Sequence, residues 1–494
     1  MKKNNLTTAV VAGLAGLAGI SSISNAVNLN SDGVGQVLVY PYYTVNNGIN
    51  TLISVVNTTD EVKAVKVRFL EGKNSRECLD FNLYMSPYDV WTAGLVATTA
   101  TAAAVGAAND GQNNVKILTS DTSCTVPAIS GQEFLPFAFS GAFDDAIGND
   151  LDRCTEGHFE MIEMGTVIGA DAAAATHTAA GVPSSCATIN GNWTPATGQW
   201  SIDPTVNMVA PDGSGGLFGS TSLIDVNGGV DMTYNADAIQ AYSLSLQHSD
   251  PGSLLPNVGS GSENTSNIFN NGVVVTDTWN ETIQAVSALY MHDNIYGEYV
   301  LSDSIGANSE WVVTFPTKFA YVDIDNTPFI GVPYEPFTVA ISPTGIGACE
   351  PYSVTGLYDR EEQSPSTPPG LIVPSPVPPG VDPTIPVFCW ETNVLEFNEV
   401  DETLGNSLVL GSKNTTHLKP GFATGWVSIS FNGNPSFVAG PGNQNTDDNV
   451  GGRTYNGLPV TGFAVQRYTN SNLSGGVLAN YAGIFAHRYS KNIL

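Results

Sequence analysis

VLVYPYYTVNNGINTLISVVNTTDE, residues 37–61, indicates the fold more clearly than any other part of the sequence. Its β-branched and aromatic runs alternate with Asn-Asn-Gly and Asn-Thr-Thr turn signals, which predicts two strands joined by short turns. Pro41 has no N–H for a strand ladder, so the first strand should lie at a sheet edge or bend there. Tyr40 and Tyr42 should share one face and Tyr43 the other, unless Pro41 marks a bulge. This arrangement favours core packing over a continuous aromatic platform for sugars.

The sequence VKAVKVRFLE, which follows directly, alternates between apolar and charged residues. Val65, Val67 and Phe69 would lie on one face, and Lys66 and Arg68 on the other, which predicts a half-exposed antiparallel strand. Similar runs recur along the whole chain, and 51 glycines and 29 prolines make it rich in turns. We therefore expect a mostly β protein with an antiparallel β-sandwich of the Ig-like or jelly-roll type.

One short helix is predicted near residues 279–292, in TWNETIQAVSALYMHDN. Thr278 and Glu281 fit a capping box, and a charge on His292 would be favourable near the helix C-terminus. Two Ala-rich stretches, ATTATAAAVGAANDGQNN and ADAAAATHTAAGVPSSC, are interpreted as insertions, the first of them partly helical. The Pro-rich loop 363–387 should be extended and semi-rigid.

The N-terminal sequence MKKNNLTTAVVAGLAGLAGISSISNA has a basic start, a short apolar run and a small-residue cleavage site, which predicts a secretory signal peptide. No later segment has the uninterrupted apolar length that a transmembrane helix needs. The expected organisation is a signal peptide at 1–26, an N-terminal β-sandwich with the Ala-rich insertions at 27–188, a turn-rich connection at 189–214 and a second β-sandwich region at 215–494.

Cysteine usage agrees with export. The six cysteines form no C-x-x-C pair, and an even number in an exported chain indicates disulfides. We expect them to pair in sequence order, because each consecutive pair brackets a loop-like insertion. The protein should be extracellular or at the cell surface, or lie in the periplasm. The cysteines are Cys78, Cys124, Cys154, Cys186, Cys349 and Cys389.

The charge of the chain limits its partners. It has 17 Lys+Arg against 46 Asp+Glu, a formal net charge of −29. Such a surface repels nucleic acid and anionic lipid, so neither is expected as a partner. Only 13% of residues are charged and 42% are hydrophobic, so the chain should fold rather than form a disordered acidic tail.

Local catalytic motifs were not found: there is no G-x-S-x-G elbow, H-E-x-x-H pair, P-loop or G-x-G-x-x-G turn. We therefore predict no enzyme, although a site assembled from distant residues would leave no such motif. His158 and Glu160 are two apart in a predicted strand and could bind a metal or move a proton. The alternative is a solvated pair on an exposed face, with Phe159 and Met161 buried.

Two further sets of residues are binding candidates. Trp193 and Trp200, in GNWTPATGQW, lie in a loop-like context and could form an exposed stacking surface for a glycan. Acidic loops could bind calcium weakly, or could be ordinary acidic turns. The calcium candidates are Asp144, Asp145, Asp150 and Asp152 in FDDAIGNDLD, Asp323 and Asp325 in VDIDN, and Asp447 and Asp448 in NTDDNVGG.

Three segments carry a resemblance to a known class. NTLISVVNTTDEVKAVKVRFLEG, EGHFEMIEMG and WVVTFPTKFAYVD resemble segments of uncharacterised exported Ig-like β-sandwich proteins of the Gram-negative cell surface. The resemblance covers part of the chain. It implies a fold and a location, and it transfers no catalytic residue.

These observations lead to one expected function and two alternatives. The first is an exported, non-enzymatic cell-envelope or surface protein with a structural or adhesive role, which self-associates through an edge strand such as the one with Pro41. The second is a secreted carbohydrate-binding or hydrolytic protein that uses Trp193 and Trp200. The third is a calcium-dependent envelope protein. The expected partner is another protein, including a second copy of the chain, or a glycan, and no cofactor other than calcium is expected.

Overall fold

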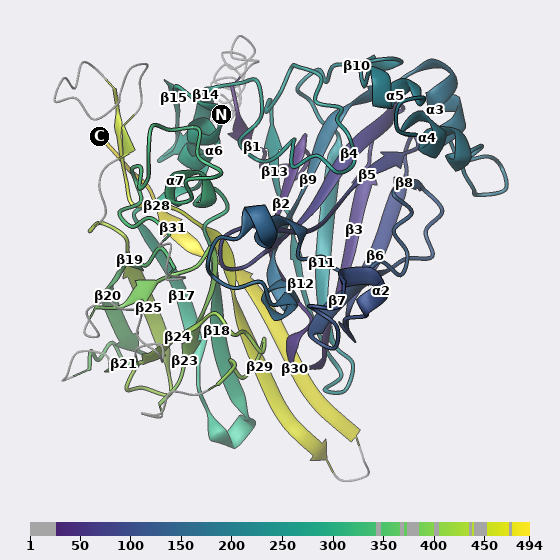
Figure 1. Cartoon of the computed structure of the whole chain (residues 1–494). Helices are drawn as coiled ribbons and strands as arrows, with labels where there is room; N and C mark the ends of the chain where they lie inside the picture. Colours follow the sequence, from purple (N-terminus) through teal and green to yellow (C-terminus); the bar gives the residue numbers. More distant parts are fainter. Residues whose placement is uncertain are drawn as a thin grey trace, which may run out of the picture.

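The computed structural model describes residues 26–341, 347–365, 370–372, 385–399, 405–433, 437–438, 452–473 and 477–494. Strands in mainly antiparallel β-sheets are the dominant regular structure, joined by loops and short helices, which confirms the predicted mostly β fold class (Figure 1). The predicted signal peptide lies outside the described residues apart from Ala26, as does most of the Pro-rich loop. None of the described helices is long and apolar enough to cross a bilayer.

The first sheet has the strand order β1-β13-β2-β9-β4-β5-β8, with β10 beside β9. It contains β9, the longest strand of the N-terminal half, and every residue of β2, β4, β5 and β9 is buried. Its strands are β1 (Asn28–Leu29), β2 (Val37–Thr44), β4 (Val62–Glu71), β5 (Glu77–Met85), β8 (Cys124–Val126), β9 (Glu156–Val167), β10 (Met208–Val209) and β13 (Asp237–Gln240).

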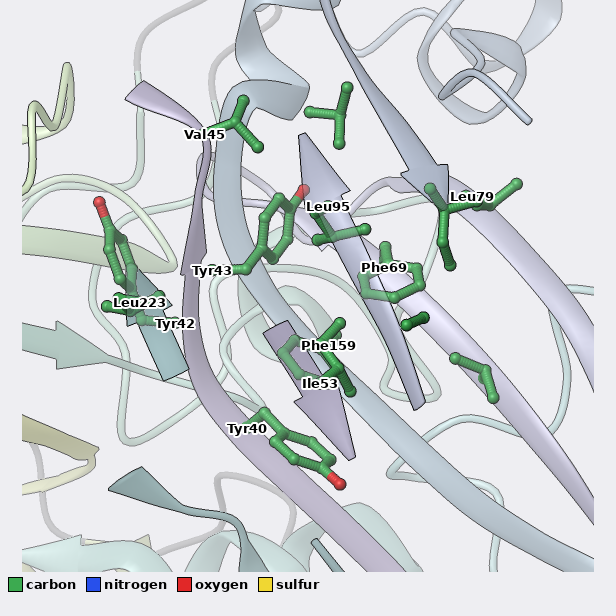
Figure 2. Packing of buried hydrophobic residues seen from close by; sticks show 14 of the residues in the cluster. Tyr40, Tyr42, Tyr43, Val45, Ile53, Phe69, Leu79, Leu95, Phe159 and Leu223 are labelled. Atoms are coloured by element: carbon green, nitrogen blue, oxygen red, sulfur yellow. The ribbon is translucent and has the colours of Figure 1, made fainter. Parts of the chain in front are cut away.

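The second sheet, in the order β12-β11-β3-β6-β7, packs against the first. Tyr43, Phe69 and Phe159 of the first sheet share one hydrophobic cluster with Ile53 and Leu223 of the second (Figure 2). Strands of the second sheet alternate buried and exposed residues, as expected for a sheet with one face in a core. They are β3 (Ile49–Asn57), β6 (Val90–Thr99), β7 (Asn113–Leu118), β11 (Leu217–Asp225) and β12 (Val230–Asn235).

Pro41 bends its strand but does not lie at a sheet edge. Strand β2 lies between β13 and β9, and its register with β9 shifts between Tyr40 and Tyr43. The shift is a bulge, which accommodates a residue without an N–H. Tyr40 and Tyr43 consequently pack on the same side against Phe159, at centroid distances of 4.1 and 6.4 Å, while Tyr42 points to the other side (Figure 2). Of the two expected alternatives, the bend is confirmed and the edge position is wrong. The bulge, which was the stated exception, moves Tyr43 to the face of Tyr40.

The predicted connection at 189–214 does not separate two sandwiches. Strands β11 and β13, which follow it, pair with β3 and β2, so residues 217–240 complete the N-terminal sheets instead of opening a second region. The connection itself is partly helical, and its helices pack over the first sheet. The short helices of this half are α2 (Ala102–Val105) in the first Ala-rich insertion, α3 (Gly169–Ala175) in the second, α4 (Cys186–Asn192) and α5 (Gln199–Ile202).

The rest of the chain forms a four-stranded sheet, β20-β25-β17-β31, and a six-stranded sheet, β21-β24-β23-β18-β29-β30. Both sheets contribute to one core, and β23 and β24 are the parallel pair. The strands are β17 (Asn294–Val300), β18 (Ala307–Thr314), β20 (Ser353–Asp359), β21 (Gly370–Ile372), β23 (Thr392–Phe397), β24 (Thr415–Lys419), β25 (Thr424–Ser430), β29 (Thr461–Leu473), β30 (Val477–Ala486) and β31 (Arg488–Ser490).

Smaller elements complete this half. Short pairs are β14 (Thr265–Asn270) with β15 (Val273–Thr278), β16 (Met291–His292) with β28 (Leu458–Pro459), β19 (Glu350–Pro351) with β22 (Val387–Phe388), and β27 (Thr454–Asn456) with β26 (Phe437–Val438) and β32 (Asn492–Ile493). The remaining helices are α6 (Thr282–Tyr290), α7 (Phe319–Val322) and the 3-10 turns at Asn46–Gly48, Phe137–Phe139, Gly141–Phe143, Leu151–Thr155 and Asp303–Ile305.

The six-stranded sheet joins the two halves. On β18, Trp311 and Val313 pack in the core of the second half, whereas Val312 between them packs in the core of the first. Val394 of β23 also belongs to the first core. Strands β18 and β23 are buried on both faces and so tie the halves together, and loops from each half meet along this boundary.

The predicted helix is present as α6, with a different start. Its N-cap is Glu281, which forms the capping box with Gln284, so Thr278 does not take part. Every residue of α6 is buried. His292 lies beyond the helix in β16 and is buried, and burial lowers the pKa of its imidazole well below its ordinary value. The expected favourable charge at the helix end is therefore wrong, because a buried imidazole without a carboxylate partner stays neutral.

All six cysteines form disulfides, but two of the three pairs differ from the expected sequence order. The bonds are Cys78–Cys154, Cys124–Cys186 and Cys349–Cys389. The disulfide pairing depends on which strands are close in space and not on which cysteines are consecutive in the sequence. The first sheet brings the start of β5, with Cys78, next to the turn that precedes β9, with Cys154. Three disulfides indicate that the chain folds in an oxidising, exported environment.

Candidate functional site

The two tryptophans expected to form a glycan platform are buried. Trp193 and Trp200 are 8% and 1% exposed, and their rings lie 5.7 Å apart. Trp200 stacks on Tyr84 of β5 at 5.3 Å, and the Trp193 indole N–H donates to the Tyr84 hydroxyl at 2.8 Å. Helices α3 to α5 need these large apolar side chains to pack on the sheet, so they form a core and not a binding surface.

His248 completes this aromatic cluster and makes it sensitive to pH. Its ring contacts the Tyr84 hydroxyl at 2.9 Å and the Pro204 carbonyl at 2.7 Å, and burial lowers the pKa of its imidazole to about 4. Between pH 4 and 6.5 the unfolded chain therefore binds more protons, so stability falls as pH falls through this window.

We expect His248 alone to lower the free energy of unfolding by about 2 kcal/mol between pH 7 and pH 5. Urea denaturation at both values should show a smaller pH dependence for His248→Gln than for the wild-type protein. Each protein is compared with itself at the two pH values, so the hydrogen bonds that the variant loses at both pH values do not affect the comparison. Equal slopes would contradict a neutral buried His248.

The first acidic cluster makes ion pairs and caps a turn. Asp145 accepts two hydrogen bonds from Arg153, at 3.0 and 2.8 Å, and Asp152 lies 2.5 Å from the Lys413 ammonium. Asp150 accepts from the backbone N–H of Asp152 at the start of a 3-10 turn. These partners fit the interpretation of the cluster as structural acids.

The other calcium candidates are also satisfied by protein groups. Asp323 pairs with Arg76 at 2.7 Å, Asp325 with the same guanidinium at 3.2 Å, and Asp144 accepts from the backbone N–H of Ala146. The described part of the chain contains no group of three or more His, Cys, Asp or Glu that could hold a metal ion. The pair at 447–448 lies outside the described residues.

His158 and Glu160 form neither a metal site nor an exposed pair. Both are buried in β9, and the pKa of His158 is lowered to about 3 by burial and by the positive charge of Arg68. The carboxylate of Glu160 accepts a hydrogen bond from Arg68 of the neighbouring strand β4. Instead of facing solvent, the carboxylate and guanidinium form an interior ion pair.

The expected half-exposed face of β4 is covered. Lys66 and Arg68 are 0% and 6% exposed, and Lys66 pairs with Asp80 of β5. The irregular segment 241–264 lies over this face: the Lys66 ammonium donates to the carbonyl of Pro251 at 2.8 Å. A distant loop thus replaces the solvent that the alternating pattern suggested, and charged partners on β5 and β9 compensate the buried cations.

A cleft of about 460 Å³ lies where loops of the first sandwich meet the second half of the chain. One wall comes from the turn after β4, which carries Lys73, and from the segment before β9, which carries Asp150 and Asp152. The opposite wall comes from the segments before β23 and β24, which carry Trp390 and Asn414. Clefts between structural units are common ligand sites, so this is the first candidate site.

Lys73 is the cation of the cleft that forms no salt bridge with a described residue. The other two cations, Arg153 and Lys413, form ion pairs with carboxylates. No carboxylate of a described residue pairs with Lys73, whose ammonium lies 5.4 Å from the centroid of the Trp390 ring. Burial lowers the pKa of Lys73, the nearby carboxylates of Glu71, Glu156 and Asp152 raise it, and the positive charge of Arg153 lowers it. The Lys73 ammonium therefore has no salt bridge among the described residues and can form one with a ligand.

The second wall is held by hydrogen bonds and carries a polar side chain that lines the cleft. The Trp390 backbone N–H donates to the Asn393 side chain at 3.0 Å, and the Asn393 amide donates back to the Trp390 carbonyl at 2.7 Å. Asn414 lines the cleft and is 5% exposed. Its side-chain amide can both donate to and accept from a ligand.

The second candidate is the outer face of the β12–β11–β3–β6–β7 sheet, which we call the sheet face. Its side chains point away from the core and are largely aliphatic or hydroxyl groups, over a shallow hollow of about 370 Å³. It consists of Asn50, Leu52, Ser54 and Val56 on β3, Val90, Thr92, Gly94 and Val96 on β6, Lys116 and Leu118 on β7, Phe218, Ser220, Ser222 and Ile224 on β11, and Asp231, Thr233 and Asn235 on β12.

Two opposite charges lie at matching positions on the edges of the sheet face. Strand β3 is the middle strand, and β7 and β12 are the two edges. On one side of β3, Asp231 pairs with Ile224, and Ile224 pairs with Asn50. On the other side, β6 pairs with β3 at Leu95 and Thr51, so the next residue, Val96, lies beside Asn50, and Val96 pairs with Lys116. The lysine and the aspartate therefore lie in one row across the sheet, two strands from its centre on either side.

Comparison of the chain with known protein families, with curated proteins and with solved structures found no match. The function is therefore inferred from the cleft and the sheet face themselves. Sequence reasoning missed both. The alternation in INTLISVVN was a usable signal for the sheet face, and a tryptophan next to a disulfide cysteine was one for the cleft.

Proposed function

We propose that the protein is an exported, non-enzymatic structural or adhesive component of the cell envelope that associates with copies of itself through the sheet face. This keeps the role suggested by the resemblance to exported Ig-like surface proteins and moves the contact away from Pro41, which is buried in β2. The observation that carries the proposal is the sheet face, on which the only charges are Lys116 and Asp231.

Net charge supports this choice of surface. The chain has a formal net charge of −29, so two copies repel each other unless they meet over a region without excess carboxylates. The central strands β11, β3 and β6 offer such a region, with rows of Ser, Thr and aliphatic side chains. Two antiparallel sheets with apolar and hydroxyl faces can stack about 10 Å apart.

Symmetry supports a second copy as the partner. A two-fold axis parallel to β3 would place Lys116 opposite Asp231 of the second copy, and the reverse, giving two ion pairs in a self-complementary contact. It would also place Ser54 near Ser54 of the second copy. Five strands about 4.8 Å apart and four rows about 7 Å apart cover about 400–670 Å² per copy, which suits a weak to moderate dimer.

The test is a charge exchange across the sheet face. We expect the wild-type chain to dimerise reversibly, with a Kd of about 1–100 μM by sedimentation velocity. Lys116→Asp and Asp231→Lys should each weaken the dimer at least about tenfold, because like charges then face each other. The double variant should restore wild-type affinity, since the ion pairs are rebuilt in reverse.

A control separates this contact from general charge effects. Asp303→Lys makes the same change in charge as Asp231→Lys on an exposed turn of the second half and should leave the dimer unchanged or slightly tighter. Ser54→Cys should yield a disulfide-linked dimer under mild oxidation. A chain that stays monomeric at millimolar concentration, or a double variant as weak as the single ones, would contradict the proposal.

A further inference from the structure

We propose that the cleft around Lys73 and Trp390 binds a small hydroxylated monocarboxylic acid of about monosaccharide size, such as a uronic acid. This inference is independent of self-association, because the cleft lies between the two halves of the chain and shares no residue with the sheet face.

The charge of the ligand follows from the lining. Lys73 is the cation without a carboxylate partner among the described residues, so it can pair with one negative charge. Asp150, Asp152 and Glu156 also line the cleft and would repel a dianion such as phosphate. A monocarboxylate therefore fits better than a phosphate ester.

The polar groups around Lys73 indicate hydroxyls on the ligand. The Asn414 amide can both donate and accept, and the neighbouring Thr415 and Thr416 hydroxyls also line the cleft. Asp150 uses one carboxylate oxygen for the backbone N–H of Asp152, and its other lone pairs can accept from a hydroxyl. The Thr415 and Thr416 hydroxyls donate to the carbonyls of Ser412 and Val387, and their lone pairs can accept from a ligand hydroxyl.

The size and rigidity of the cleft agree with this ligand class. Its volume of about 460 Å³ is within the usual range for small-molecule sites. The Trp390 ring holds the Lys73 ammonium by a cation–π contact, and Asn393 and the adjacent Cys349–Cys389 disulfide fix the tryptophan. A preformed site loses less conformational freedom when the ligand binds.

Isothermal titration calorimetry of the mature chain with galacturonate tests the proposal. The control ligands are galactose, which is the corresponding uncharged sugar, and acetate, which has the carboxylate without the sugar hydroxyls. We expect galacturonate to bind at least tenfold more tightly than either. Lys73→Met should weaken galacturonate at least tenfold and leave galactose unchanged, and Lys73→Arg should retain most of the affinity. Lys116→Met, which removes a lysine outside the cleft, is the matched control and should have no effect.

A second measurement uses the wild-type protein alone. Galacturonate should protect Lys73 from reductive methylation, mapped by peptide mass spectrometry, and should leave Lys116 reactive. Equal affinity for galacturonate and galactose, tighter binding of inorganic phosphate, or no protection of Lys73 would overturn the assignment. Full affinity in Lys73→Met would overturn it as well.

Discussion

Replacing Arg68 with methionine should lower the free energy of unfolding by about 3–5 kcal/mol. Arg68 is 6% exposed and donates to Glu77 of β5 and Glu160 of β9, each 2% exposed. Methionine keeps much of the apolar volume of the side chain and removes the charge, so two buried carboxylates remain without their cation. Urea or guanidinium unfolding followed by circular dichroism measures the loss.

The loss should depend on pH. Burial raises the pKa of Glu160, and Arg68 holds it down. Without the guanidinium the pKa of Glu160 rises further in the folded variant. At pH values above the ordinary carboxyl pKa, the folded variant then keeps a proton that the unfolded chain has released. The variant should therefore lose more stability at pH 8 than at pH 5, where protonation relieves the unpaired charge.

Two further variants test the cause. The triple variant Arg68→Met, Glu77→Gln, Glu160→Gln should recover a large part of the stability, because it leaves no buried charge. Arg488→Met, on the exposed strand β31, should change stability by less than about 0.5 kcal/mol. A loss below about 1 kcal/mol for Arg68→Met would show that solvent reaches the pair.

Removing the Cys78–Cys154 disulfide should cost about 4–6 kcal/mol. The bond closes a sequence separation of 76 residues, and the chain-entropy relation gives about 4.5 kcal/mol for such a loop. Both cysteines are 0% exposed and belong to the core between the first two sheets, so replacing them with alanine also removes packed sulfur atoms. Thermal and chemical unfolding of Cys78→Ala, Cys154→Ala measures the sum.

The Cys349–Cys389 bond provides the control. It closes a separation of 40 residues, for which the same relation gives about 0.6 kcal/mol less, and its cysteines lie in a small separate cluster. The double alanine variant of this pair should lose less stability than that of Cys78 and Cys154. The reverse order would contradict the role of the first bond in holding the core together.

The candidate sites could be predicted from the sequence only in part. The sequence shows Lys73 in a predicted turn and Trp390 next to a cysteine. The two residues are 317 positions apart, and no local sequence pattern predicts that they are in contact. The outward side chains of β3 followed directly from alternation in INTLISVVN. Their uncharged neighbours on β6 and β11 depended on strand pairing, which alternation does not specify.

The sequence by itself determined the local structure of this protein: the mostly β fold, the bend at Pro41, the helix near 279–292 and the presence of disulfides. Each follows from spacing within a few residues, or from composition. Tertiary structure alone decided which polar faces meet solvent. Lys66 and Arg68 alternate like exposed residues and are buried because segment 241–264 covers them. Trp193 and Trp200 lie in a stretch that reads as a loop, yet Trp193 caps one short helix, Trp200 lies in another, and both form a core on the first sheet. The physical reason is that burial depends on what packs against a face, and that partner comes from a distant part of the chain.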